Sequence, residues 1–174
     1  MDTDKRRKAI LNLLKTSPQP IKGQELAEAF NVTRQVVVKD LAIIKAADPS
    51  IVSTFGGYLA LKDKAVHKRI FRVRHTGDEM YDELRIILKY GGTTEDIVIE
   101  HPYYGELKGN LYIRTLNDLE KFLDEFKKSG ALPLSELTGG VHMHTVTCQD
   151  EASLGLIEEE LTEEGFITED IYGL

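Results

Sequence analysis

The stretch GQELAEAFNVTRQVVVKDLAIIKAA, residues 23–47, predicts two helices joined by a tight turn. Apolar residues recur at helical spacing over residues 23–30. A turn at residues 31–33 follows, and Thr33 is placed to cap a second helix that runs to about Ala47. Two short helices joined by so short a turn are typical of a helix-turn-helix.

The flanking segments extend this motif to a winged helix-turn-helix. Residues 4–16 form a further amphipathic helix, which the prolines of residues 17–20 end. On the other side, IVSTFGGYLAL, residues 51–61, predicts two strands around Gly56-Gly57, which indicates a hairpin. The sequence therefore predicts a winged helix-turn-helix DNA-binding domain over residues 1–62.

In a helix-turn-helix the N-terminal end of the last helix enters the major groove of DNA. The candidate DNA-binding residues at this end are Thr33, Arg34, Gln35 and Lys39. Lys5, Arg6 and Arg7 in the first helix are candidates for phosphate contacts. The alternatives to DNA binding are a three-helix bundle whose charges form an ordinary solvated face, and a winged helix used for protein contacts.

Charge is divided unevenly along the 174 residues. Residues 1–62 carry 10 Lys+Arg against 6 Asp+Glu, a net charge of +4, whereas residues 63–174 carry 12 against 23, a net charge of −11. The basic part suits a phosphate backbone, which the acidic part would repel. No run of apolar residues is long enough for a membrane span or a secretory signal, so we expect a soluble, cytoplasmic protein. The single cysteine, Cys148, excludes an internal disulfide and a CxxC zinc site.

Residues 68–174 alternate between strand and helix after a charged linker, DKAVHKR. A Thr-x-x-Glu capping box opens the first of these helices, and Gly91-Gly92 closes it. The expected elements are strand 70–75, helix 77–90, strands 97–99 and 111–113 around the turn-rich HPYYGELKGN, helix 116–128, strand 141–148, helix 150–164 and strand 166–168. This order predicts an α+β domain with helices on one face of a mainly antiparallel sheet.

Four residues of this second domain form a candidate metal site. Glu83 lies at the edge of the apolar stripe of its helix, where an unpaired carboxylate is costly and a cation is its natural partner. His142 and His144 are two apart on a strand and therefore project from one face. His75, at a strand end eight residues before Glu83, can reach the same cleft. Three nitrogens and one carboxylate suit zinc, nickel, iron or manganese.

Each of these residues also has an ordinary structural interpretation, as a hydrogen-bonded or solvated side chain. We interpret His67, in the linker, as a solvated residue and Cys148 as a small core residue. His101 and Tyr104 belong to a loop whose rings could stack on a small aromatic ligand, or that could be a structural turn.

Three motifs, taken together, resemble a known family. They are the stretch from His75 through Glu83, the run EHPYYGE at residues 100–106 and the run GGVHMHT at residues 139–145. Behind a helix-turn-helix of this type, they resemble the 3H-domain transcription regulators, the niacin-responsive repressors of bacteria.

The resemblance implies a cytoplasmic homodimer that represses genes of NAD precursor synthesis or niacin uptake, with nicotinic acid as corepressor. It also implies that the second domain is an open-faced α/β sandwich like that of the phosphocarrier protein, and that it holds a divalent metal, with nickel and zinc the foremost candidates. Carried over by position, the metal ligands are His75, Glu83, His142 and His144. His101 matches the remaining family histidine, so we assign it with Tyr104 to the ligand pocket.

The working hypothesis is a repressor that binds operator DNA, not an enzyme, in which the metal fixes the nicotinate pocket or coordinates nicotinate directly. The alternative is a metal-responsive regulator with no organic effector. A metal-dependent hydrolase fused to a DNA-binding module is a third hypothesis, because a His/Glu site with open positions can activate water. Against it, His101 is the one separate acid or base near the motifs.

Overall fold

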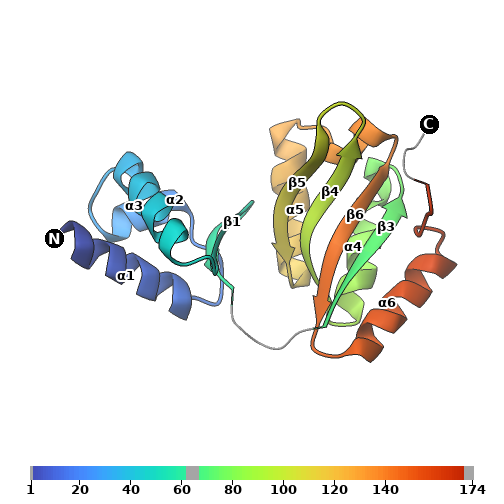
Figure 1. Ribbon diagram of the computed structural model, residues 1–174, viewed down its shortest axis with the longest axis horizontal. Helices are drawn as coiled ribbons and strands as arrows, with labels where there is room; N and C mark the ends of the chain where they lie inside the picture. The colour runs from blue at the N-terminus through green and yellow to red at the C-terminus, as the bar shows by residue number, and fades with distance from the viewer. Residues whose placement is uncertain (1, 62–66, 171–174) are drawn as a thin grey trace. The chain divides into compact units, whose positions relative to one another are not determined.

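The chain divides into two compact units between residues 64 and 65. The computed structural model describes residues 2–61 and 67–170 (Figure 1). Most of the linker expected at residues 63–69 lies outside the described residues, and its last three residues belong to a strand. None of the described helices is both long and apolar enough to cross a membrane.

The first unit is the predicted winged helix-turn-helix. Its elements are α1 (Thr3–Thr16), α2 (Gly23–Ala29), α3 (Arg34–Ala47), β1 (Ile51–Thr54) and β2 (Gly57–Ala60). The side chains of α1, α2 and α3 share one core around Ile10, Leu26 and Leu41. Thr33 caps α3 as predicted, because its hydroxyl accepts a hydrogen bond from the Val36 amide at 3.4 Å.

The wing, formed by β1 and β2, is tied to the helices through Ile21, in the segment between α1 and α2. β1 and β2 pair antiparallel from Ile51↔Ala60 to Thr54↔Gly57, and Ile21 forms a bridge to Tyr58. Gly57 has φ +128°, and a Cβ there would lie 2.4 Å from the Ile21 carbonyl oxygen. Glycine is therefore required at this position by both conformation and space.

One predicted phosphate contact is wrong. Arg6 is 9% exposed, and its Nε donates to the Asp40 carboxylate at 2.7 Å, whereas Lys5 is exposed. Arg7 Nε donates to the other oxygen of Asp40 at 2.9 Å. The two arginines therefore fasten α1 to α3, because a carboxylate buried in the helix interface needs charged partners.

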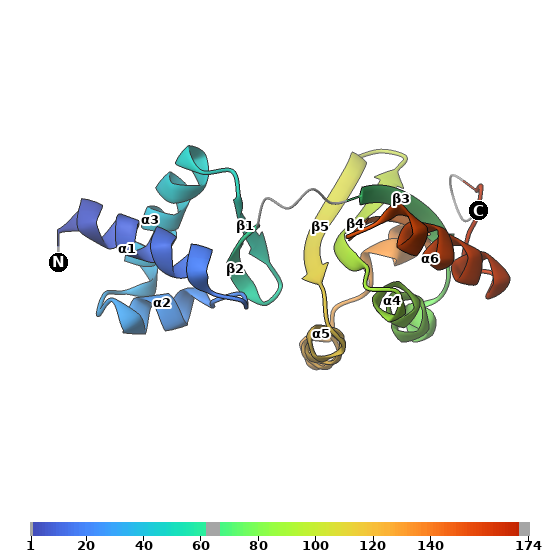
Figure 2. The same ribbon diagram turned by 90° about the horizontal axis from the view of Figure 1, so that it is seen from below.

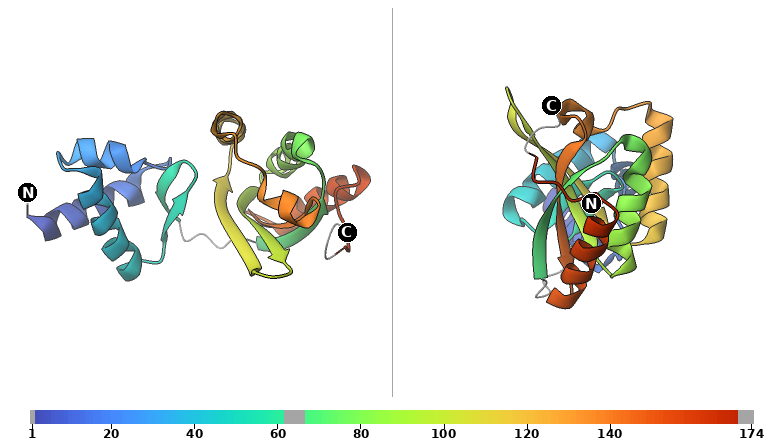
Figure 3. Two further views of the ribbon diagram at one scale, coloured as in Figure 1. Left: turned by 90° about the horizontal axis from the view of Figure 1, so that it is seen from above. Right: turned by 90° about the vertical axis from the view of Figure 1, so that its right-hand side faces the viewer.

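The second unit contains a four-stranded antiparallel sheet in the order β3-β6-β4-β5. Its elements are β3 (His67–Arg74), η1 (Gly77–Glu79), α4 (Met80–Lys89), β4 (Thr93–His101), β5 (Gly105–Ile113), α5 (Leu116–Ser129), η2 (Leu134–Thr138), β6 (Val141–Cys148) and α6 (Glu151–Glu163). The three α-helices cover one face of the sheet and leave the other uncovered by helices (Figures 2 and 3). This is the expected open-faced α+β sandwich.

Three expected elements differ in the structure. The capping-box helix begins as a 3₁₀ turn, η1, before α4. The run at residues 101–110 is mostly strand, because β4 and β5 form a hairpin whose turn spans residues 102–104. The last expected strand, 166–168, is reduced to a single bridge between Val73 and Ile167.

Candidate functional site

Three histidines and one glutamate meet between the sheet and the helices that cover it. His75 follows the end of β3, Glu83 lies on α4, and His142 and His144 lie on β6. All four are buried, with Glu83 at 0% exposure. The structure thus brings together the whole set of metal ligands predicted from the sequence.

Strand pairing places the histidines. In the β3–β6 pair, Val73 lies opposite His142 and Phe71 opposite His144, so these side chains share a face with His75. The turn before β6 is tight, since Gly140 has φ +91° and a Cβ there would lie 2.5 Å from the His75 carbonyl oxygen. A side chain at position 140 would push the two strands apart at the site.

Helix periodicity places the carboxylate. Glu83 shares a face of α4 with Leu84 and Ile87, both of which are buried. The sequence suggested that Glu83 lies at the edge of this stripe, but the structure buries it completely. It is a charged residue in the centre of the interface between α4 and the sheet.

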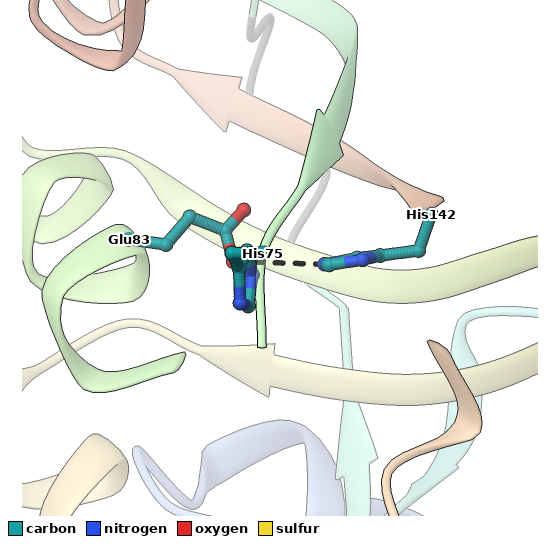
Figure 4. Close-up of side chains that lie close together, drawn as sticks. All are labelled: His75, Glu83 and His142. Atoms are coloured by element: carbon teal, nitrogen blue, oxygen red, sulfur yellow. Dashed lines mark hydrogen bonds and ion pairs between the residues drawn. The ribbon is translucent and has the colours of Figure 1, made fainter. Parts of the chain in front are cut away.

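The three imidazoles converge on one carboxylate oxygen of Glu83. Glu83 Oε2 lies 2.8 Å from His75 Nε2, 3.3 Å from His144 Nε2 and 3.7 Å from His142 Nε2. The ligand atoms of His75, Glu83 and His142 all lie within 4.8 Å of one another. Figure 4 shows these three side chains turned toward one another, His75 from the segment that follows β3, Glu83 from α4 and His142 from β6.

Each imidazole is oriented by a backbone carbonyl on its other nitrogen. His75 Nδ1 lies 2.6 Å from the Thr76 carbonyl, His142 Nδ1 2.8 Å from that of Gly140, and His144 Nδ1 2.5 Å from that of Asp96. A carbonyl can only accept, so each Nδ1 carries the proton and donates. In the neutral ring, Nε2 is then unprotonated and directs its lone pair toward Glu83.

This arrangement fits a cation. Three Nε2 lone pairs face a carboxylate, and both kinds of group are hydrogen-bond acceptors. Such groups can lie this close only if protons or a positive ion stand between them. The second oxygen, Glu83 Oε1, is buried without a hydrogen-bond partner among the described residues. Nδ1–H bonded to a carbonyl with Nε2 free is also how proteins orient histidines that bind a metal. The residues present therefore suit a transition metal held by three nitrogens and a carboxylate oxygen.

The titration of the four groups is coupled through Glu83. Burial by itself would raise the pKa of Glu83, but the charge of His144 and the imidazole hydrogen bonds hold that pKa well below its ordinary value. Burial acts to lower the pKa of His75 and His144, but Glu83 outweighs it, so both pKa values lie above 6.5. Burial dominates at His142 and leaves its pKa below 6.5. Without metal, the Glu83 carboxylate and the protonated forms of His75 and His144 therefore stabilise one another.

We expect the metal-free protein to lose stability in its second unit as pH rises above about 6.5. A group whose pKa is raised in the folded state contributes stability that is fully present below its unfolded pKa and is lost as pH rises through the folded pKa. His75 and His144 follow this sign, whereas His142 titrates below that range. Urea unfolding of chelator-treated protein at several pH values measures the effect. Glu83→Gln should flatten this decline, and an equal decline in that variant would contradict the assignment.

Asp96 is a part of the site that the sequence did not reveal. β4 carries a register shift between Thr94 and Asp96, and Asp96 is 2% exposed. Its carboxylate accepts from the Thr145 amide at 2.9 Å and pairs with Lys108 Nζ at 2.9 Å, while its carbonyl faces His144. Asp96 therefore ties β4 to β6 beside His144. Nothing in the local pattern marks Asp96, because its partners lie 12 and 49 residues away.

A cavity of about 200 Å³ adjoins the three histidines. It lies between the sheet, α4, α5 and the segment that leads into η2. Its lining residues are His75, Met80, Leu84, Ile97, Leu111, Phe122, Phe126, Leu132, Pro133, Leu134, Ser135, His142 and His144.

The predicted ligand residues His101 and Tyr104 lie elsewhere. They are at the β4–β5 turn, where their rings stack with centroids 4.8 Å apart. The His101 Nδ1 accepts from the amides of Tyr103 and Tyr104 at 3.2 and 3.1 Å, so the imidazole caps its own turn. Neither residue lines the cavity beside the histidine cluster.

The other two candidate residues behave as interpreted from the sequence. Cys148 is buried, and burial raises the pKa of its thiol. The His67 side chain is about half-exposed, and its Nδ1 lies 3.3 Å from Glu151 Oε2. Neither contributes to the cluster of ligand atoms.

The proposed DNA-reading surface is exposed. Thr33, Arg34, Gln35 and Lys39 are all solvent-accessible on the first turns of α3. An open cleft beside Arg34 is also lined by Lys22 and by the wing residues Ser53 and Thr54. The N-terminal end of α3 is therefore accessible, as it must be if it is to enter the major groove of DNA.

A winged helix-turn-helix linked to a domain with a buried histidine–carboxylate centre defines a DNA-binding regulator. The 3H domain family matches residues 68–170, and an HTH domain family matches residues 6–59. The chain belongs to the 3H-domain family of transcription regulators.

Two relatives match almost the whole chain. One, from Thermotoga maritima, is named Probable transcription repressor NiaR and is 35% identical over 165 residues, which cover 95% of this chain and 94% of the relative. The other, named Transcription repressor NadR, is from Bacillus subtilis and is 36% identical over 169 residues, with the same two coverages. Both names describe repressors, which places the chain among regulators and not among enzymes.

Proposed function

We propose that the protein is a transcription repressor that binds operator DNA as a homodimer and responds to nicotinic acid through a metal-loaded 3H domain. The observation that carries the metal part is the set of three Nε2 atoms directed at Glu83 with each Nδ1 already bonded. The names of the relatives support repression, and the exposed end of α3 supports DNA binding.

The protein's own groups supply a preformed site. The Nδ1 carbonyl bonds hold the three rings in place, and Glu83 supplies the charge that a divalent cation requires. When bound, such a cation offers a Lewis-acid position to a carboxylate or a ring nitrogen of an effector. Zinc and nickel are the first metals to test.

Regulation by nicotinate requires that nicotinate bind two arrangements of the protein with different affinities. Nicotinate shifts the protein toward an operator-binding dimer only if it binds that dimer more tightly than the alternative arrangement. The dimer must also present its two α3 helices to operator half-sites on one face of the duplex.

Operator binding tests this function directly. In a gel shift on the upstream region of the protein's own operon in metal-buffered solution, we expect nicotinate with metal to tighten binding by at least about tenfold. Arg34→Ala should weaken binding in every condition by about 1–3 kcal/mol, whereas Lys121→Ala, in the other unit, should not. Full operator binding with metal alone, unchanged by nicotinate, would instead identify a metal sensor without an organic effector.

A further inference from the structure

The face of α3 that points away from the core combines one cation with apolar side chains. The opposite side of α3 packs into the core of the first unit through Val37, Leu41 and Ile44. The outward face consists of exposed residues at helical spacing, namely Gln35, Val38, Lys39 and Ala42. Val38 is 47% exposed, although it directly follows the fully buried Val37. A helix that bound DNA through charge alone would not need apolar side chains on this face.

The outward residues of α3 have the spacing of base-reading residues. Recognition helices contact base edges through positions i, i+3, i+4 and i+7 near their N-terminal end. Counted from Gln35, these positions hold Gln35, Val38, Lys39 and Ala42. Arg34 lies on the flank of this face, beside a cleft that Lys22 and the wing also line. A cation on that flank suits a phosphate, which leaves the outward face for the bases.

The chemistry of these side chains favours one kind of base pair. Base edges in the major groove present hydrogen-bond donors and acceptors, and their one methyl group is that on C5 of thymine. The side chains of Val38 and Ala42 can neither donate nor accept a hydrogen bond, so their favourable contact is with that methyl group. Gln35, on the same face, suits the N6 and N7 atoms of adenine. An A·T pair presents both the adenine atoms and the thymine methyl group.

We infer that α3 selects A·T pairs in each operator half-site, because Val38 and Ala42 pack against thymine methyl groups. Val38 is the principal contact, since it is larger than Ala42 and lies nearer the end of α3 that enters the groove. Gln35 bonds adenine at a neighbouring pair. This inference rests on the proposed function for operator binding, and it adds which bases the first unit distinguishes.

Replacing thymine with uracil tests this contact, because uracil lacks the C5 methyl group and keeps every hydrogen-bonding atom of thymine. The full chain, with and without zinc and nicotinate, first selects its preferred duplexes from a pool of random sequence. Each thymine of a selected half-site is then replaced singly by uracil, and the affinity is measured by fluorescence anisotropy. We expect a loss of about threefold to tenfold at one or two positions, as the burial of one methyl group predicts.

Val38→Ala isolates the contact, and Ile43→Ala is its matched control. Val38→Ala should bind the thymine duplex about threefold to tenfold more weakly, and should bind the thymine and uracil duplexes within about twofold of each other. Alanine is a better helix former than valine, so α3 is not put at risk. Ile43 is 48% exposed, but it follows Val38 by five residues and so points about 140° away around the helix. Ile43→Ala should keep the full loss on uracil.

The outcomes separate this inference from the proposed function. Selective binding that is indifferent to uracil at every position overturns the methyl contact but leaves the repressor function in place. A loss on uracil that persists unchanged in Val38→Ala also overturns it, since the methyl group would then act through the shape of the DNA. Equal removal of the uracil effect by Ile43→Ala would contradict the assignment to Val38. If no sequence is selected in any condition, the proposed repressor function fails, and this inference fails with it.

Discussion

Glu83→Gln is expected to lower metal affinity by more than about 100-fold. Loss of a partner that only orients a ligand already costs about 10–100-fold, and Glu83 would be a ligand itself. Glutamine keeps the size of the side chain but removes the charge on which three imidazoles converge. Competition with a chromophoric chelator measures the affinity. The same variant should lose any metal dependence of operator binding.

Asp82→Asn is the matched control for this prediction. Asp82 precedes Glu83 on α4 but is exposed, so its neutralisation should leave metal affinity almost unchanged. Equal losses in the two variants would show that the effect comes from the charge of the helix. Wild-type affinity in Glu83→Gln would remove the carboxylate from the site.

Asp40→Ala should destabilise the winged helix unit by about 3–5 kcal/mol. The substitution removes the carboxylate partner of Arg6 and Arg7 and leaves arginine charge uncompensated in a helix interface. Small domains have only about 5–15 kcal/mol of stability in total, so this loss would remove a large fraction of the stability of the unit. Burial acts to raise the pKa of Asp40, but the hydrogen bonds and charges of Arg6 and Arg7 outweigh it and keep that pKa below its ordinary value, so Asp40 stays charged at neutral pH.

Urea unfolding followed through the Ile10 and Ile44 methyls reports this unit separately, since both belong to its core. Asp4→Ala is the control, because the Asp4 side chain is 82% exposed and its contact with Arg7 is long, at 3.4 Å. That variant should change unfolding little. A shift in Asp40→Ala no larger than in Asp4→Ala would show that the buried pair does not hold α1 to α3.

The first unit could be predicted because its signals are local. Apolar spacing, the proline break, the Thr33 cap and the Gly-Gly turn each act within a few residues, and the structure places the helices and the wing accordingly. Arg6 was misassigned for the same reason. Its position in α1 indicates a basic helix face, but its partner Asp40 is 34 residues away and is apparent only when α1 packs on α3.

In the second unit, the alternation of a strand and the period of a helix were enough to direct His142 and His144 to one face and Glu83 toward the core. These regularities specify the direction of a side chain relative to its own element, because backbone geometry repeats along the chain. They do not specify which element covers that face. Tertiary packing alone decided the complete burial of Glu83, the carbonyl that orients each imidazole and the cavity walls contributed by α5. Each of these depends on groups far apart in sequence, whose contact is determined by how the elements stack.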